Sequence, residues 1–224
     1  QAKRAMARAV GATLVEKPDA VTVEQLLEQA AMLCPAPGVP ETHAVIAAAV
    51  RAGVPIRTEI DLAYEWEQAR ARGPRPILAI TGTDGKTTTT MLVAHILNTA
   101  GHCAVAVGNT EVPFVAALDE NADVFVVECS SFRLNWLDSF RAEAAVWLNL
   151  APDHQNWHTS MAAYEAAKAR IWQHRRATDV AVGFGDDPIV MRNLRAVGGI
   201  TRTRMLGGAR ALLLDPGAGL DALM

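Results

Sequence analysis

A short turn bracketed by glycines, between an expected strand and an expected helix, constrains this chain more than any other feature. The apolar run 77–80 predicts a buried strand, and Gly82-Thr83-Asp84-Gly85-Lys86-Thr87-Thr88 follows it closely. Glycines let backbone N–H groups curl around phosphate oxygens, and the start of the next helix presents its positive dipole to the anion. The sequence therefore predicts a phosphate-binding loop in which Lys86 reaches the terminal phosphates and Thr87 binds Mg²⁺.

The loop is shorter than the general nucleotide-binding pattern Gly-x-x-x-x-Gly-Lys-Ser/Thr. That pattern requires a glycine five residues before Gly85, where Ile80 stands. The alternative is an ordinary strand-to-helix turn with a solvated lysine. The strand on one side and the helix on the other favour the phosphate-binding interpretation.

Expected strands and helices alternate along the chain, which predicts an α/β fold with a mostly parallel sheet. A Gly/Pro cluster at 73–76 predicts a boundary between two domains, 1–74 and 75–224. For the first domain we expect a helix ending at Gly11, a helix opened by Thr22, helices at 42–52 (closed by Gly53) and 59–72, and strands at 13–15, 32–34 and 55–58. For the second we expect strands at 77–80, 104–107, 124–127, 144–148 and 180–182, and helices at 87–100 and 161–176.

Composition and charge exclude several classes of protein. No apolar run approaches the roughly 18 residues of a membrane-spanning helix, so no membrane association is expected. A net charge of -3 and a pI near 6.1 give no general attraction for nucleic acid. The three cysteines lie far apart without metal-ligand spacing, which favours a reducing cytoplasm over a disulfide framework or a zinc site.

Two polar residues follow expected strands near the loop. Ligands of open parallel sheets bind beyond the carboxyl ends of the strands, so Glu128 and His154 are expected to converge with the loop on one edge. Glu128 is placed to hold Mg²⁺, a cation that prefers oxygen ligands. The alternatives are a solvated glutamate at a strand end and a surface histidine.

Lys168 shares a helix face with apolar and aromatic residues at three- and four-residue spacing. These are Met161, Tyr164, Ile171 and Trp172. Burial lowers the pKa of a lysine, and the neutral amine can react with CO₂ to give a carbamate, an oxygen ligand for metal. The alternative is a lysine whose stem is buried and whose tip reaches water.

Taken together, these motifs resemble the Mur ligases in order and spacing. The resemblance covers nearly the whole chain and rests on the loop, on Glu128-Cys129-Ser130-Ser131-Phe132, on Asn149 with Asp153-His154, and on Tyr164 with Ala167-Lys168. The Glu-x-Ser-Ser-Phe element, with the turn at 36–40 and Gly108-Asn109, is similar to the branch that adds D-glutamate. Other Mur ligases and folylpolyglutamate synthetases share the loop but differ at that element.

The resemblance implies an ATP-dependent ligase that joins D-glutamate to UDP-N-acetylmuramoyl-L-alanine through an acyl phosphate, in peptidoglycan synthesis. It also implies a Rossmann-like domain for the UDP-sugar at 1–74, a central ATP-binding domain at 75–224, a cytoplasmic location and a monomer. Lys86, His154 and Lys168 would be catalytic. Thr87 and Glu128 would hold one Mg²⁺, and Glu128, His154 and carbamylated Lys168 a second. Gly38, Asn109 and Ser130 would face the UDP-sugar.

Several positions depart from the usual family pattern. Arg133 stands in place of Gln, Ala36 in place of Ser, Gln155-Asn156 in place of Leu-Asp, and Phe184 in place of Asn. None of these removes an expected metal ligand. Arg133 is expected to alter substrate contacts, and Asn156 removes a carboxylate near the metal site. The chain could instead be a nucleotide-binding module without catalysis, but the polar residues near the loop argue against that.

The resemblance also predicts that the family's first strand precedes Gln1, and that the adenine-contacting segment and the D-glutamate domain follow Met224. We therefore expect the 224-residue chain alone not to form UDP-N-acetylmuramoyl-L-alanyl-D-glutamate. Incubation with ATP, Mg²⁺ and both substrates, followed by chromatography, tests this expectation. Product above the level of a reaction without protein would refute it.

Overall fold

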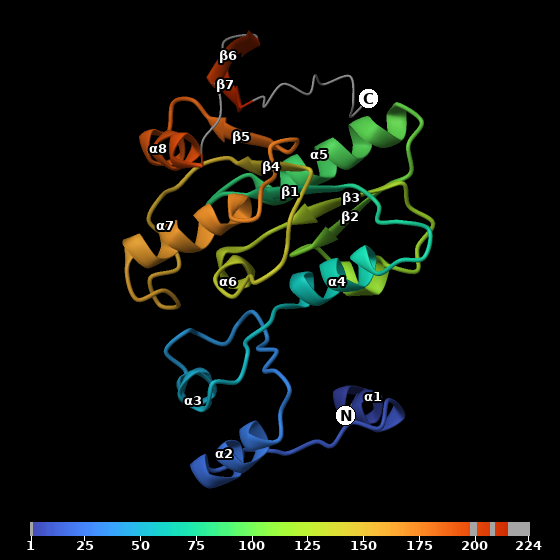
Figure 1. Ribbon diagram of the computed structural model, residues 1–224, viewed down its shortest axis with the longest axis vertical. Coiled ribbons are helices and arrows are strands. Elements are labelled where there is room, and N and C mark those ends of the chain that lie inside the picture. The colour runs from blue at the N-terminus through green and yellow to red at the C-terminus, as the bar shows by residue number, and fades with distance from the viewer. Residues whose placement is uncertain (1, 198–200, 207–208, 215–224) are drawn as a thin grey trace. The chain divides into compact units, whose positions relative to one another are not determined.

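The computed structural model describes residues 2–197, 201–206 and 209–214, with side chains for residues 4–197 (Figure 1). It divides into two compact units, and each is described by itself. The smaller unit comprises Gln1–Leu33 and His43–Ile56, and the larger comprises Cys34–Thr42 and Arg57–Met224. No helix of the described residues is long and apolar enough to cross a membrane.

The smaller unit consists of the helices α1 (Ala2–Ala9), α2 (Ala20–Glu28) and α3 (Ala44–Ala52). Leu27 of α2 is buried with Ala48 and Ala49 of α3. The left-handed Gly53 ends α3, as predicted. The start of α2 was predicted wrongly, because the Asp19 carboxylate accepts a hydrogen bond from the Thr22 backbone and caps the helix three residues earlier.

The three strands expected in this region do not form a sheet. Residues 13–15 are not in a strand, and the segments around 33 and 56 meet only in one isolated parallel bridge, Leu33 to Ile56. A single bridge satisfies few backbone groups, so α2 and α3 supply most of the packing in this unit. A Rossmann-like arrangement of residues 1–74 stays a prediction.

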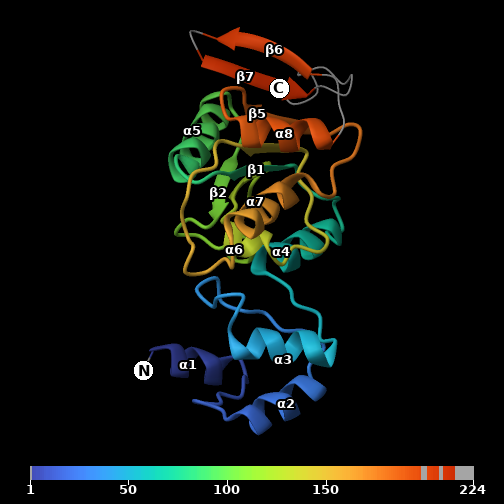
Figure 2. The same cartoon turned by 90° about the vertical axis from the view of Figure 1, so that its left-hand side faces the viewer.

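A mostly parallel sheet forms the centre of the larger unit, which confirms the predicted fold class (Figure 2). The strand order is β2-β3-β1-β4-β5-β7-β6. The first five strands in this order, β2, β3, β1, β4 and β5, run parallel. β7 pairs antiparallel with β5 and with β6. The bounds are β1 Ile77–Thr81, β2 Ala104–Gly108, β3 Val124–Glu128, β4 Ala144–Trp147, β5 Val180–Phe184, β6 Thr201–Leu206 and β7 Ala209–Leu214. All five strands predicted in this region are present.

The helices of this unit are α4 (Glu59–Gln68), α5 (Lys86–Thr99), α6 (Ser131–Leu134), α7 (Met161–Ala169) and α8 (Pro188–Ala196), with 3-10 turns η1 (Phe114–Ala117) and η2 (Arg170–Trp172). The helix predicted at 161–176 is shorter than expected, because the α-helix ends at Ala169 and the chain continues as the 3-10 turn η2. There Trp172 donates a hydrogen bond to the Ala145 carbonyl and packs against Trp147. The helix predicted at 59–72 also ends early, at Gln68.

Helix α4 belongs to the larger unit, although it precedes the predicted boundary at 73–76. A buried ion pair joins it to the sheet. Arg75, 7% exposed, donates to both carboxylate oxygens of Glu67, 2% exposed, at 2.9 and 2.6 Å. The same guanidinium donates to the Leu118 and Glu120 carbonyls and lies 4.4 Å from the Phe125 ring centroid. Arg75 thus ties α4, the loop after η1 and β3 together.

Replacing Glu67 by alanine leaves the Arg75 charge buried without its carboxylate. We expect Glu67→Ala to lower the free energy of unfolding by about 3–5 kcal/mol. Tryptophan fluorescence in urea measures this in the larger unit, which contains all five tryptophans. The control is Arg192→Ala, which removes an exposed ion pair with Glu165 and should cost about 0–1 kcal/mol. Equal losses in the two variants would contradict the assigned role of the buried pair.

Candidate functional site

The predicted phosphate loop connects β1 to α5. Gly85 has a φ of 79°, a left-handed conformation suited to glycine, and is the N-cap residue of α5. A Cβ on Gly82 would lie 3.0 Å from the Leu148 Cβ, so the loop passes close to the end of β4. The Lys86 amine donates to the Thr83 carbonyl at 2.8 Å. In the first turn of α5, Thr87 and Thr88 are exposed, so the start of this helix is accessible to an anion.

Asn149, directly beyond β4, holds the loop in shape. Its Oδ1 accepts hydrogen bonds from the backbone N–H groups of Thr83 and Asp84, both at 2.9 Å, and its Nδ2 donates to the Asp84 carbonyl at 3.2 Å. Sequence reasoning included Asn149 in the family motif but gave it no role. Its position beyond the strand next to β1 is the signal that could have identified it.

Glu128 ends β3 and is 1% exposed. Its Oε1 accepts a hydrogen bond from the Asn109 side chain at 3.1 Å, while its buried Oε2 has no hydrogen-bond partner among the described residues. An unpaired buried carboxylate oxygen is costly unless a cation or donor binds it. The solvated alternative for Glu128 is therefore wrong, and this oxygen fits a metal ligand.

A glycine places the Asn109 carboxamide beside this carboxylate. Gly108 ends β2 with a φ of 97°, and a Cβ there would lie 2.5 Å from the Glu128 carbonyl oxygen. The close approach lets the Asn109 backbone N–H donate to that carbonyl at 2.9 Å. Backbone and side chain of Asn109 therefore both bind Glu128.

Lys168 lies inside the protein, 1% exposed, so its tip does not reach water. Its amine donates to the Gly82 carbonyl at 2.6 Å and lies 4.6 Å from the Tyr164 ring centroid. Burial, and then the charge of Lys86, lower the pKa of Lys168 to about 7. A large part of its amine is neutral at physiological pH, as a reaction with CO₂ requires.

His154 lies in the loop after β4 with a φ of 52°, and 37% of its side chain is exposed. Its ring contacts Phe132 at 4.7 Å and Tyr164 at 5.9 Å between centroids. Burial lowers its pKa, against the opposing effect of Asp153. The Tyr164 hydroxyl contacts the Thr83 hydroxyl at 3.1 Å, so Tyr164 connects His154 and Lys168 to the phosphate loop.

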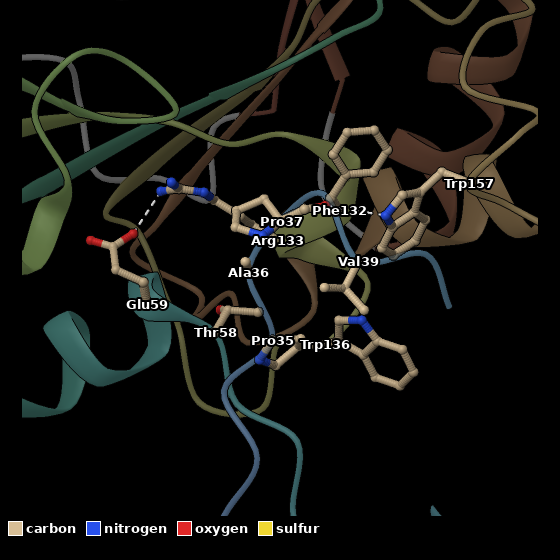
Figure 3. Close-up of a pocket in the computed structure, with 10 residues that line it drawn as sticks. All are labelled: Pro35, Ala36, Pro37, Val39, Thr58, Glu59, Phe132, Arg133, Trp136 and Trp157. Carbon is tan, nitrogen blue, oxygen red and sulfur yellow. Dashed lines mark hydrogen bonds and ion pairs between the residues drawn. The ribbon is translucent and has the colours of Figure 1, made fainter. Parts of the chain in front are cut away.

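The residues expected at the UDP-sugar, Gly38, Asn109 and Ser130, belong to three different segments of the larger unit. Gly38 belongs to the turn at 35–40, part of which lines a small pocket with Phe132, Arg133 and Trp157 (Figure 3). Trp157 donates to the Pro37 carbonyl at 3.1 Å. Asn109 binds Glu128, as described above. Ser130 caps α6, since its hydroxyl accepts a hydrogen bond from the Arg133 backbone.

Arg133, which departs from the family pattern, lines this pocket together with Trp136 and Trp157. Its guanidinium forms an ion pair with Glu59 at 2.6 Å (Figure 3). Glu59 also accepts a hydrogen bond from the Val115 backbone at 2.7 Å. The Arg133 side chain is 12% exposed. Its charge is therefore balanced within the pocket wall by a carboxylate that is itself fixed.

Sequence reasoning missed His158. This residue is 2% exposed, and its Nε2 lies 2.9 Å from the Ser131 hydroxyl. Its ring packs against Trp157 and Tyr164 with centroids 4.5 and 5.1 Å away, and burial lowers its pKa to about 4. A single histidine in an irregular loop gives no periodic signal, so only the folded arrangement identifies this neutral, buried imidazole.

Within the part of the chain that has described side chains, no three His, Cys, Asp or Glu residues gather as a metal site. The expected ligand set has only two residues of these types, Glu128 and His154. Its other members are the Thr87 hydroxyl and a modified Lys168. Oxygens from a nucleotide are the further ligands that Mg²⁺ usually takes in such sites.

Comparisons with known proteins agree with this geometry. The Mur ligase middle domain matches residues 80–203. A UDP-N-acetylmuramoylalanine–D-glutamate ligase of Streptomyces coelicolor is 39% identical over 86% of this chain and 43% of its own length. The ligase of the same name from Mycolicibacterium smegmatis is 42% identical over 84% of this chain and 36% of its own length. The chain thus spans less than half the length of these relatives.

Solved structures share the fold at low sequence identity. The MurF ligase of Thermotoga maritima, in complex with ADP, is 18% identical with a TM-score of 0.51, covering 75% of this chain and 48% of that chain. A UDP-N-acetylmuramate:L-alanyl-gamma-D-glutamyl-meso-diaminopimelate ligase from Neisseria meningitides is 16% identical with a TM-score of 0.53, covering 95% and 72%. With a family match over more than half of its residues, the chain belongs to the Mur ligase family.

Proposed function

We propose that the protein carrying this chain is an ATP-dependent ligase that adds D-glutamate to UDP-N-acetylmuramoyl-L-alanine. The observation that carries the proposal is the buried Lys168 amine on the Gly82 carbonyl of the phosphate loop, with a pKa near 7. A loop that only bound nucleotide would not need a buried, partly neutral lysine against its backbone. The names of the relatives from Streptomyces coelicolor and Mycolicibacterium smegmatis support the choice of substrates.

In the proposed reaction, the N-terminal end of α5 and the Lys86 amine bind the phosphates of ATP. A carboxylate oxygen of the acceptor attacks the γ-phosphorus, the bond to the leaving oxygen breaks, and ADP and an acyl phosphate result. The amine nitrogen of D-glutamate then attacks the acyl carbon. The C–N bond forms, the C–O bond breaks, phosphate leaves and the amine proton passes to solvent. Lys86 would stabilise the transferring phosphoryl group.

Thr87 and Glu128 would hold one Mg²⁺, and Glu128, His154 and carbamylated Lys168 a second. The unpaired, buried Oε2 of Glu128 supports this assignment. Bound Mg²⁺ would neutralise negative charge on the phosphates. Asn109 orients the Glu128 carboxylate, and Tyr164 packs against both His154 and Lys168. Asn109 and Tyr164 would therefore orient the side chains that bind the metal.

The acceptor would lie at the turn around Gly38, near Asn109 and Ser130. The aromatic side chains of Phe132 and Trp157 beside this turn support that placement, since aromatic faces suit contact with a sugar ring. Residues 1–74 would form part of the UDP-sugar domain and residues 75–224 part of the ATP-binding domain. We further propose a cytoplasmic monomer that binds neither nucleic acid nor membrane.

Removing the Lys86 amine tests the assigned chemistry. In the full-length protein, Lys86→Ala should slow formation of UDP-N-acetylmuramoyl-L-alanyl-D-glutamate by about 100-fold or more, the usual effect of losing one donor to a developing charge. Chromatography of the product measures the rate. Lys17→Ala, in the smaller unit, should leave it unchanged. An unchanged rate in Lys86→Ala, or product only from another UDP-muramoyl or folate acceptor, would sink the proposal.

Carbamylation of Lys168 gives a pH-dependent signal. Because only the neutral amine reacts with CO₂, a lysine with a pKa of about 7 is mostly reactive at pH 8, whereas an ordinary lysine, with a pKa of about 10.4, is under about 1% neutral there. Carbon-13 NMR in labelled bicarbonate should show a carbamate at pH 8 that falls by most of its intensity at pH 6. Lys168→Met should lack it and Lys17→Ala retain it. The same signal in Lys168→Met, or none at pH 8, would contradict carbamylation.

A further inference from the structure

The segment directly after β4, residues 149–151, lies along the phosphate loop. Besides the side-chain bonds of Asn149 described above, the Asn149 carbonyl accepts a hydrogen bond from the Thr83 backbone at 3.1 Å. Two residues further on, the Ala151 backbone N–H donates to the Thr83 hydroxyl at 2.9 Å. The loop is bounded by Gly82 and Gly85, and glycines impose little conformation of their own. The shape of the loop therefore depends on where this segment lies.

Leu150, between those two contacts, is held by a carboxylate from another element. Its backbone N–H donates to Oδ2 of Asp187 at 2.8 Å. Oδ1 of the same carboxylate caps α8, because it accepts hydrogen bonds from the Ile189 and Val190 backbones at 2.9 and 3.1 Å. One side chain thus joins the segment beside the loop to the first turn of α8.

Helix α8 gives this carboxylate a firmly packed base. Val190, Met191 and Leu194 are buried in the main hydrophobic core of the larger unit. A Cβ on Gly183 of β5 would lie 2.8 Å from the Val190 Cγ1, so the helix packs directly against the sheet (Figure 1). The Asp187 carboxylate is therefore fixed relative to the core, and Leu150 is fixed through it.

Capping α8 does not by itself require the second oxygen of Asp187. A helix N-cap needs one side-chain oxygen, and serine or asparagine supplies it about as well as aspartate. The oxygen that binds Leu150 acts outside α8. Hydrogen bonds to an ionised acceptor are stronger than those between neutral groups, so this contact suits a residue that holds a segment in place.

We propose that Asp187 is a positioning residue, which holds residues 149–151, and through them the phosphate loop, in the shape that receives the nucleotide phosphates. The proposal rests on the function proposed above and adds to it a residue that lies outside the loop. Without the Leu150 bond, the loop keeps its residues but loses part of its support. A displacement of about 1 Å in such a site can slow a reaction by about 100-fold.

Hydrogen exchange in the full-length protein tests whether Asp187 acts on the loop. Asp187→Ser keeps one oxygen for the α8 cap and loses the oxygen that binds Leu150. We expect the backbone amides of Thr83 and Asp84 to exchange about 10-fold faster, the ratio that corresponds to losing a hydrogen bond to a charged group. The amides of α8 should exchange as before. Mass spectrometry measures both sets of amides.

Arg192→Ala is the matched control, since it removes an exposed ion pair from the same helix and should change neither set of amides. Faster exchange in α8 as well as in the loop would mean that Asp187 only stabilises the helix. Unchanged exchange in the loop would mean that residues 149–151 support it without Asp187. Either result overturns the positioning role, whether or not the protein forms the proposed product.

Reaction rates test the consequence for catalysis. Asp187→Ser should lower kcat for formation of UDP-N-acetylmuramoyl-L-alanyl-D-glutamate by about 10- to 100-fold. The KM for UDP-N-acetylmuramoyl-L-alanine should stay unchanged, because this substrate is proposed to bind at the turn around Gly38. Asn149→Ala should also slow the reaction, and adding Asp187→Ser to it should cost no further rate, because both changes act on one segment.

Losses that multiply in the double variant would contradict an action of Asp187 through residues 149–151. Absence of product from the unaltered protein would remove the proposed ligase activity. The exchange rates of Thr83 and Asp84 would still decide the positioning role in that case.

Discussion

The parallel pairing of β1 with β3 on one side and β4 on the other is the constraint on which the site depends. Ile80 lies beside Glu128, and Thr81 lies beside Trp147, two residues before Asn149. This register brings the loop, the Glu128 carboxylate and the Asn149 carboxamide to one edge of the sheet. The Thr81 hydroxyl then donates to the Cys129 carbonyl, which extends the contact between β1 and β3 past the last paired residues.

Charges in the larger unit divide into those that are fully paired and those that are not. Arg75 and Arg141 are buried in bidentate contact with Glu67 and Asp179 respectively. Glu128 and Lys168 are buried as deeply, and among residues 4–197 neither has a hydrogen-bonded carboxylate or guanidinium partner. Paired charges of the first kind hold the fold, whereas incompletely compensated ones concentrate where a ligand could complete them.

The sequence predicted the sheet of the larger unit well because buried parallel strands are short, continuous apolar runs. It also placed the loop, Glu128 and Lys168, since each stands at a strand end or at a helical spacing that burial imposes. It failed for residues 13–15, where a short apolar run forms no strand, and for α2, where Asp19 is the stronger cap. The roles of Asn149 and His158 depend on neighbours far apart in the chain, which no local pattern contains.

Gly108, at the end of β2, determines how closely Asn109 can approach Glu128. Gly108 has a left-handed backbone conformation, and a Cβ added to it would lie 2.5 Å from the backbone oxygen of Glu128. Any side chain there would push the two strand ends apart and carry the Asn109 carboxamide away from the carboxylate. The orientation of the Glu128 carboxylate therefore depends on Gly108 having no side chain. The small volume of Gly108 is thus what allows the two Asn109 hydrogen bonds that hold Glu128 in place.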